Sequence, residues 1–221
     1  MKNFFNIDSP LMIFMSDLTD LIILNVVFLI CCIPIVTIGP AITAMHYVTL
    51  KMVKDENGSV LKNFFKSFKE NFKQSLIVWL IFVVISLVFI IDLKILNNMG
   101  INENKIFATI VGAIYIFFCF IAMYSFPLLA RFENSLKQTI KNAFLMSILH
   151  IFKTIIMAVF YAIPVVLIPL HTTMIAVYLL MGASVSAYIN SFFWNSIFKK
   201  YEPAKAEEEI TKDEDFVIME E

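Results

Sequence analysis

Five long apolar runs constrain this chain more than any other feature of its sequence. Each run could cross about 30 Å of hydrocarbon as a helix that rises about 1.5 Å per residue. A spanning segment must be helical here, because lipid offers no partners to a bare backbone and the apolar residues do not alternate as in membrane barrels. The sequence therefore predicts an all-α, polytopic membrane domain over residues 1–200, with spans at about 18–38, 76–96, 106–130, 152–170 and 174–197.

The low content of charged residues supports a membrane protein. Only 16% of the 221 residues are charged and 60% are apolar, whereas a soluble domain has roughly a quarter of its residues charged. Cys31, Cys32 and Cys119 all lie inside apolar runs without metal-ligand spacing, so we expect them to be small buried hydrophobic residues.

The distribution of Lys and Arg predicts the orientation of the spans. Cytoplasmic connections carry an excess of basic residues. Here the connection between the first and second runs and that between the third and fourth are rich in them, whereas the other connections and the N-terminal stretch are poor. We therefore predict a multi-pass protein of the bacterial cytoplasmic membrane, with its N-terminus outside and its C-terminus in the cytoplasm.

Residues 39–53 are the ambiguous part of this topology. The stretch is apolar, but it is too short and too polar to qualify as a span. We predict that it continues the first helix into the interface, with a kink at Pro34 and a restart at Pro40, because proline suits a first helical turn. Re-entry of this stretch into the membrane remains an alternative.

A basic, phenylalanine-rich helix is predicted over residues 59–75. Asn57 and Gly58 belong to a turn, and Ser59 can cap the helix that follows. The helix carries lysines on one side and apolar residues at helical spacing on the other, as in helices that lie in the inner headgroup layer. The apolar residues are Leu61, Phe64, Phe65, Phe68 and Phe72. Such a surface is either a docking site for a partner or lipid, or a simple anchor.

Few residues offer chemistry. No catalytic or phosphate-binding motif is present, and the three histidines are scattered, so we expect no enzymatic activity, cofactor, metal site or nucleic-acid partner. The acidic tail at 201–221 is expected to be disordered and solubilising.

Three polar residues inside the spans are candidates for a functional role. Asn25 and Asn190 can hydrogen-bond across helices, either as packing contacts or as the lining of a polar cavity. Asp92 lies near the outer end of the second span, where an interfacial position is the expected one.

Arg131 and Glu133 follow Pro127 at the cytoplasmic end of the third span. Proline frees backbone carbonyls, so Arg131 could donate to them while Glu133 meets a lysine of the basic helix. Alternatively, Arg131 only sets the topology at the membrane edge.

Two blocks of sequence carry a resemblance to a known family. The run from LNVVFLICCIPIVTIGP to FKQSLIVWL, residues 24–80, and the run YSFPLLARFENSLKQTIKNAFLMSILHIFKT, residues 124–154, resemble the YesL-like family of bacterial integral membrane proteins of unassigned function. The closing FWNSIFKKYEP is also similar. Motif positions that we take as structural or partner-contact candidates include Pro34, Gly39, Asn57, Gly58, Phe68, Phe72, Pro127, Arg131 and Glu133, to which the basic helix adds Phe64 and Phe65.

The resemblance implies about five spans and genes often placed near carbohydrate ABC-type transporters and polysaccharide-degrading enzymes. We therefore expect an accessory or regulatory component associated with carbohydrate uptake, whose partners are the bilayer and either transporter subunits or further copies of itself. An autonomous small-molecule transporter or channel that acts as a homo-oligomer is the alternative.

Overall fold

The computed structural model describes residues 10–54, 56, 58–98, 105–167 and 173–201, and every regular element within them is a helix. The first part of the chain forms α1 (Pro10–Cys32), the 3-10 turn η1 (Ile35–Thr37), α2 (Ile38–Val53), α3 (Val60–Glu70) and α4 (Phe72–Asn98). The second part forms α5 (Lys105–Arg131), α6 (Leu136–Leu149), α7 (Ile151–Leu167), α8 (Thr173–Val177), the π-helix η2 (Tyr178–Gly182) and α9 (Ala183–Phe198).

The predicted all-α, multi-pass membrane architecture is confirmed. Four helical segments are long and apolar enough to cross a membrane, in α1, α4, α5 and the continuous run from α8 to α9. The pair α6 and α7, which is bent by 100°, would be a fifth. The last segment is not one regular helix, because the π-helical turn η2 interrupts it.

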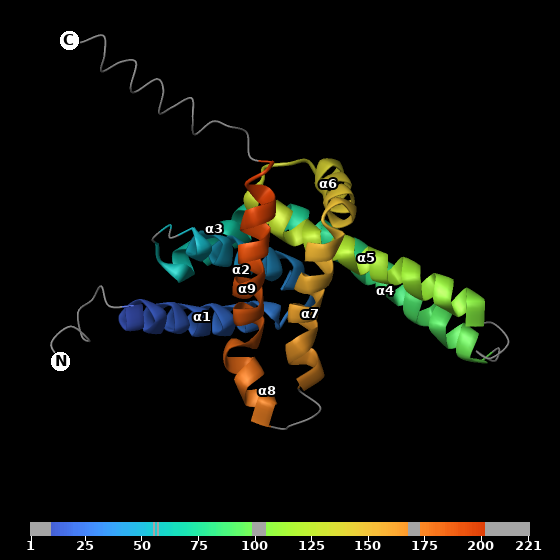
Figure 1. The fold of residues 1–221 in the computed structure, drawn as a ribbon, viewed down its shortest axis with the longest axis horizontal. Coiled ribbons are helices and arrows are strands. Elements are labelled where there is room, and N and C mark those ends of the chain that lie inside the picture. Colours follow the sequence, from blue (N-terminus) through green and yellow to red (C-terminus); the bar gives the residue numbers. More distant parts are fainter. Residues whose placement is uncertain (1–9, 55, 57, 99–104, 168–172, 202–221) are drawn as a thin grey trace, which may run out of the picture.

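The helices form three arms around α2. In Figure 1, α4 and α5 run side by side as one arm, α7 and the α8–α9 run form a second, and α1 points to the opposite side from α4 and α5. Helix α2 contacts α1, α4, α5 and α9 and so joins the three arms. Helix α3 packs against both α1 and α2.

Residues 33–53 differ from the predicted continuation of the first span. Helix α1 ends at Cys32, and the chain turns at the exposed Pro34. The Thr37 hydroxyl donates to the Cys31 carbonyl at 2.6 Å, which satisfies a backbone group at the end of α1. Helix α2 then packs back along α1, with Pro40 in its first turn as predicted.

Helix α2 is the centre of the fold. Ten of its sixteen residues are buried, and its hydroxyl and imidazole groups meet three other helices. Thr43 shares a hydrogen bond of 2.8 Å with Ser75 of α4, Thr49 accepts one of 2.8 Å from Ser191 of α9, and His46 pairs with α7. These bonds satisfy polar groups that neither lipid nor apolar side chains could satisfy.

Gly39 allows α2 to approach α4 closely. A Cβ atom at this position would lie 2.5 Å from the Trp79 Cβ and 2.6 Å from the Ser75 carbonyl oxygen. Neither atom is the mobile end of a side chain, so only glycine fits. The Trp79 indole also donates to the Ile35 carbonyl at 3.0 Å, which ties the turn after α1 to α4.

Candidate functional site

A polar groove lies where the α3–α4 corner meets the end of α5. Its volume is about 690 Å³. The residues that line it come from both sequence blocks, and they are Tyr47, Lys66, Glu70, Asn71, Gln74, Leu129, Ala130, Arg131, Phe132, Glu133, Asn134 and Ser135. Basic and acidic side chains thus converge from two segments that are about sixty residues apart in the chain.

The first wall of the polar groove is fixed by the break between α3 and α4. Helix α3 ends at Glu70, and the side-chain Nδ2 atom of Asn71 donates to the Ser67 carbonyl at 3.2 Å. Ser67 and Ser75, one turn on either side of the break, are both fully buried. The corner is therefore held from inside, and Lys66 and Glu70 remain exposed on its outer side.

The second wall is the short connection between α5 and α6. Helix α5 continues through the buried Pro127 to Arg131. Phe132 then packs edge to face on Phe198 of α9, with ring centroids 5.3 Å apart. Ser135 accepts a hydrogen bond from the Gln138 amide and caps α6. Glu133, between these two anchors, is exposed.

The structure places the phenylalanines of the basic helix differently from the prediction. Phe64 is fully buried in a cluster with residues of α1 and α2, so it faces the protein and not the acyl chains. Phe68 stacks on Phe64 and meets Phe72 edge to face, whereas Phe65 is 44% exposed. Sequence periodicity found the apolar face of α3 but could not show that α1 and α2 cover it.

Gly58 is a motif position that lies between two helices. Gly58 lies in the α2–α3 connection close to the Asn63 side chain, where a Cβ would be 2.8 Å from the Asn63 Nδ2 atom. Helix α3 begins directly after Ser59, whose side chain makes no capping bond, and it ends at Glu70, before the predicted limit at residue 75. Asn57 lies outside the described residues.

Asn25 uses both ends of its side-chain amide in hydrogen bonds to another helix. Its side-chain amide donates to the Leu179 carbonyl at 2.7 Å, and its oxygen accepts from the Ser184 amide at 3.0 Å. Both partners flank or belong to η2, where the π-helical turn disrupts the regular bonding of the helix. Asn25 therefore closes a break in the α8–α9 run from the neighbouring helix α1.

The other two polar candidates lie in different surroundings. Asn190 is fully buried and donates to the Ser186 carbonyl of its own helix at 2.9 Å, while its Oδ1 atom has no partner among the described residues. Asp92 is half-buried on the last third of α4.

No local sequence pattern predicts the polar contacts of α2. His46, Tyr161 and the serine–threonine pairs are single polar residues within apolar runs, and only the packing brings them together. No group of three His, Cys, Asp or Glu side chains that could hold a metal occurs within the described residues. Cys31 and Cys32 are half-buried, but Cys119 is exposed on α5, contrary to the prediction.

Comparison with known proteins supports the resemblance. The family described as "Protein of unknown function, DUF624" matches residues 21–93. The chain is also 26% identical, over 120 residues, to the protein named "Uncharacterized protein YesL" of Bacillus subtilis (strain 168). The resemblance to the YesL-like family is confirmed. The alignment with the Bacillus protein covers 54% of this chain and 56% of that protein, and no solved structure matches the chain.

The matched part of the chain has a clear structural meaning. Residues 21–93 contain most of α1, the turn at Pro34, all of α2 and α3, and most of α4. The family match therefore covers the buried centre of the fold and one wall of the polar groove. The other wall, with Arg131 and Glu133, lies in the second sequence block, beyond that match.

Proposed function

We propose that this chain is an accessory membrane component that docks a charged cytoplasmic segment of a membrane transporter in the polar groove. The observation that carries the proposal is the convergence of Lys66 and Glu70 from α3 with Arg131 and Glu133 from the α5–α6 connection around one groove of about 690 Å³. A groove that carries both signs of charge favours a partner segment with complementary charges, which fixes its register as well as its affinity.

The other segments predicted to be cytoplasmic lie at the same end of the fold. The Nε2 atom of His150, between α6 and α7, is 3.1 Å from the hydroxyl of Tyr201, which follows α9. Lys153 of α7 donates to the Ser196 hydroxyl of α9 at 2.8 Å. Phe132 packs on the last turn of α9. This grouping supports a cytoplasmic C-terminus and a cytoplasmic groove in a bacterial cell membrane. The association with carbohydrate ABC-type uptake rests on the family resemblance.

Charge reversal at Lys66 tests the docking. The full chain would be purified gently from its native membrane, and proteins that co-purify in stoichiometric amounts would be identified by mass spectrometry. We expect a transporter permease subunit with the native chain and its loss with Lys66→Glu. The matched control is Lys62→Glu, one turn earlier on α3, which is exposed but does not line the groove.

Two results would count against docking in the groove. Retention of the partner by the Lys66→Glu variant and also by the separate Glu133→Lys variant would exclude the groove. Loss of the partner with Lys62→Glu alone would assign the contact to another face. Phe65→Ser tests the exposed side of α3 separately; Phe64 is unsuitable for such a test because it is buried in the core.

The orientation of the N-terminus follows from how α1 and α2 pack, and here we propose a topology different from the predicted one. Asp17 and Asp20 of α1 line the same pocket as Lys51 and Glu56 at the end of α2. The start of α1 and the end of α2 therefore lie together, as in a helical hairpin. If α2 crosses back, both chain termini face the cytoplasm.

Cysteine labelling decides between the two topologies. In a variant without the three native cysteines, Asn3→Cys should react with a membrane-impermeant maleimide only after the cells are permeabilised. Asn102→Cys, in the connection predicted to be external, is the control that should react in intact cells. Labelling of Asn3→Cys in intact cells would support the external N-terminus and a single crossing by α1.

The alternative of an autonomous transporter has one structural observation in its favour. Transporters often use broken helices near the middle of the membrane, and here η2 interrupts the last span while Pro164 lies inside α7. If this alternative holds, the purified protein should be a homo-oligomer without other subunits, and Asn25→Leu should change flux in reconstituted vesicles. Unchanged flux would count against a path beside η2.

A further inference from the structure

The outer side of α3 combines basic and apolar side chains that the fold leaves exposed. The inner side of the helix packs through Phe64 on α1 and α2. On the outer side, three lysines recur at i, i+4 and i+7, and two apolar residues, each 44% exposed, lie next to them. We call this surface the α3 lysine face, and its residues are Leu61, Lys62, Phe65, Lys66 and Lys69.

The positive charge of the α3 lysine face is not neutralised within the fold. Among the residues that the structure describes, Lys51 of α2 pairs with Glu56 at 3.7 Å, but no carboxylate pairs with the three lysines of α3. Glu70, at the end of the helix, is exposed. Three unpaired cations within two turns attract an acidic segment, and the exposed apolar residues beside them favour one that also carries apolar side chains.

The chain itself supplies such a segment after the last described residue. Residues 202–221 contain nine Asp or Glu residues and two Lys, which leaves a net charge of −7. The acids are densest in EEEITKDED, residues 207–215, and the apolar run FVIM, residues 216–219, follows directly. An acidic stretch next to an apolar one complements both parts of the α3 lysine face.

The tail leaves the described fold near this face. Tyr201 lines a hollow of about 280 Å³ together with Phe132 and Asn134. The same two residues line the polar groove, to which α3 contributes Lys66. Tyr201 therefore lies one hollow away from Lys66. Residues 202–213 could extend over about 40 Å, so the acidic stretch is long enough to cross from one hollow to the other and follow α3.

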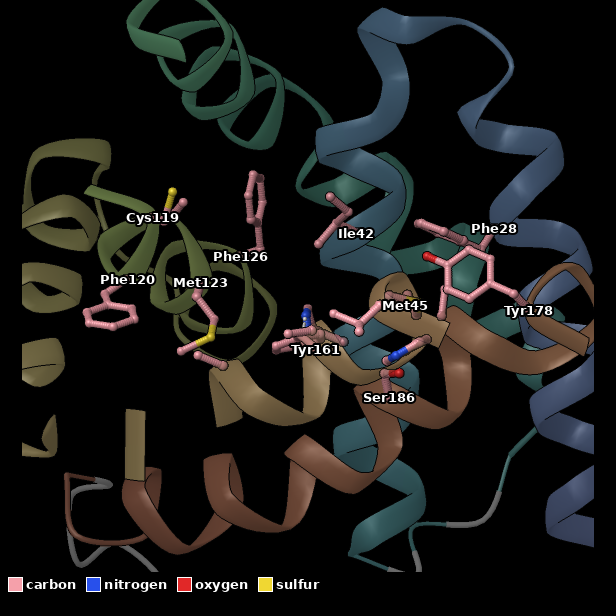
Figure 2. A pocket seen from close by; sticks show the side chains of 17 residues that line it. Phe28, Ile42, Met45, Cys119, Phe120, Met123, Phe126, Tyr161, Tyr178 and Ser186 are labelled. Atoms are coloured by element: carbon pink, nitrogen blue, oxygen red, sulfur yellow. Dashed lines mark hydrogen bonds between the residues drawn. The ribbon is translucent and has the colours of Figure 1, made fainter. Parts of the chain in front are cut away.

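The apolar cavity of the fold does not suit an acidic segment. This cavity, of about 610 Å³, lies between α1, α2, α5, α7 and the η2–α9 region, and His46 of α2 is one of the residues that line it. Figure 2 shows Phe120 and Phe126 at one end and Phe28 and Tyr178 at the other. None of its lining residues is acidic or carries Lys or Arg. A carboxylate would lose its hydration there without gaining a counter-charge.

We propose that residues 207–219 dock on the α3 lysine face, with the acidic stretch on the lysines and Phe216 against Leu61 and Phe65. Ion pairs at a surface are weak singly, but the tether keeps the tail at an effective concentration in the millimolar range, so a few weak contacts hold it. Because Lys66 also lines the polar groove, the docked tail covers one wall of the groove. The docking does not depend on what else binds there.

Distances between two spin labels, measured by pulsed electron paramagnetic resonance, test this docking. In the full chain without its native cysteines, one label is placed at Ser59→Cys, an exposed position before α3, and the other at Thr211→Cys, between the acidic runs. The nanodiscs contain phosphatidylglycerol, so that anionic lipid competes for the lysines. We expect a short, narrow distance whose population falls at least about fivefold in about 1 M salt, where charges are screened within about 3 Å.

Charge reversal on two helices locates the site. The triple variant Lys62→Glu, Lys66→Glu and Lys69→Glu should abolish the short distance, because it replaces all three cations of the α3 lysine face. The matched control is Lys137→Glu with Lys141→Glu, at two exposed lysines of α6, and it should leave the distance unchanged. Persistence of the short distance in the α3 variant, or its loss in the α6 variant, would overturn the proposal.

Reversal of the tail provides the complementary test. Glu207→Lys, Glu208→Lys and Glu209→Lys together should release the tail from the parent chain and return the short distance in the α3 variant. A broad distribution in the parent chain would overturn the proposal. So would a short distance in phosphatidylcholine that is lost with phosphatidylglycerol, because the lysines then bind lipid headgroups. Should the α3 variant fail to fold, the tail variant and the salt dependence still decide.

Discussion

Helices α2 and α4 differ most clearly in how hydropathy relates to burial. Ten of the sixteen residues of α2 are buried, including a histidine and two threonines, whereas α4 exposes large aliphatic side chains along most of its length. Helix α4 has the length and hydropathy of a membrane span, whereas the sixteen-residue α2 is too short for one. The comparison teaches that hydropathy identifies helices that face lipid, while the helix at the centre of a membrane domain can be shorter and more polar, because protein surrounds it.

Gly39 is the position where we expect the largest effect. Gly39→Leu would place side-chain atoms where Trp79 and the Ser75 backbone lie, and we expect a loss of about 3 kcal/mol or more in the free energy of unfolding. The measurement is the fraction of folded protein in an SDS titration.

Gly112→Leu on α5 is the matched control for Gly39. A Cβ at Gly112 meets nothing within 4 Å, so this variant should change the unfolding free energy by less than about 0.5 kcal/mol. Equal effects of the two substitutions would show that α2 and α4 are not packed as closely as described.

Asn25 should give the next largest effect. Asn25→Leu removes the donor to Leu179 and the acceptor from Ser184, which leaves backbone groups of the π-helical break unpaired, and we expect a loss of about 2 kcal/mol in the same titration. Thr19→Val, on the same helix, is the control, because the exposed Thr19 hydroxyl donates to the Met15 carbonyl of α1 and bonds to no other helix among the described residues. A neutral outcome for Asn25→Leu would mean that η2 rearranges to a regular helix.

The smallest expected effect comes from a matched pair of valines. Val48 on α2 is 1% exposed and Val88 on α4 is 53% exposed. Val48→Ala should cost about 1 kcal/mol through lost packing, and Val88→Ala should lie within about 0.5 kcal/mol of the native chain because lipid replaces the lost contacts. A larger loss with Val88→Ala would indicate that α4 is covered by another subunit.

The residues of the polar groove were predictable from the sequence, but their proximity was not. Arg131 and Glu133 were identified by their place after an apolar run, and the lysines of α3 by helical periodicity. Their meeting in one groove could not be read from either pattern, because it depends on the break at Asn71 and on the docking of Phe132 on α9. The same limit applies to Phe64, which was predicted to lie on a surface open to a partner or lipid and is instead covered by α1 and α2.

The sequence by itself determined that this is an all-α membrane protein, where its long helices lie and which connections are basic. These are local properties, because the length of an apolar run decides whether it can cross the bilayer and nearby basic residues decide its orientation. Only the tertiary structure decided that α2 turns back at Pro34 into the centre, that Asn25 closes the break at η2 and that His46 lines a cavity. Those features depend on contacts between segments far apart in the chain. In an apolar sequence, such contacts are made by single Ser, Thr, Asn and His side chains whose partners no local pattern reveals.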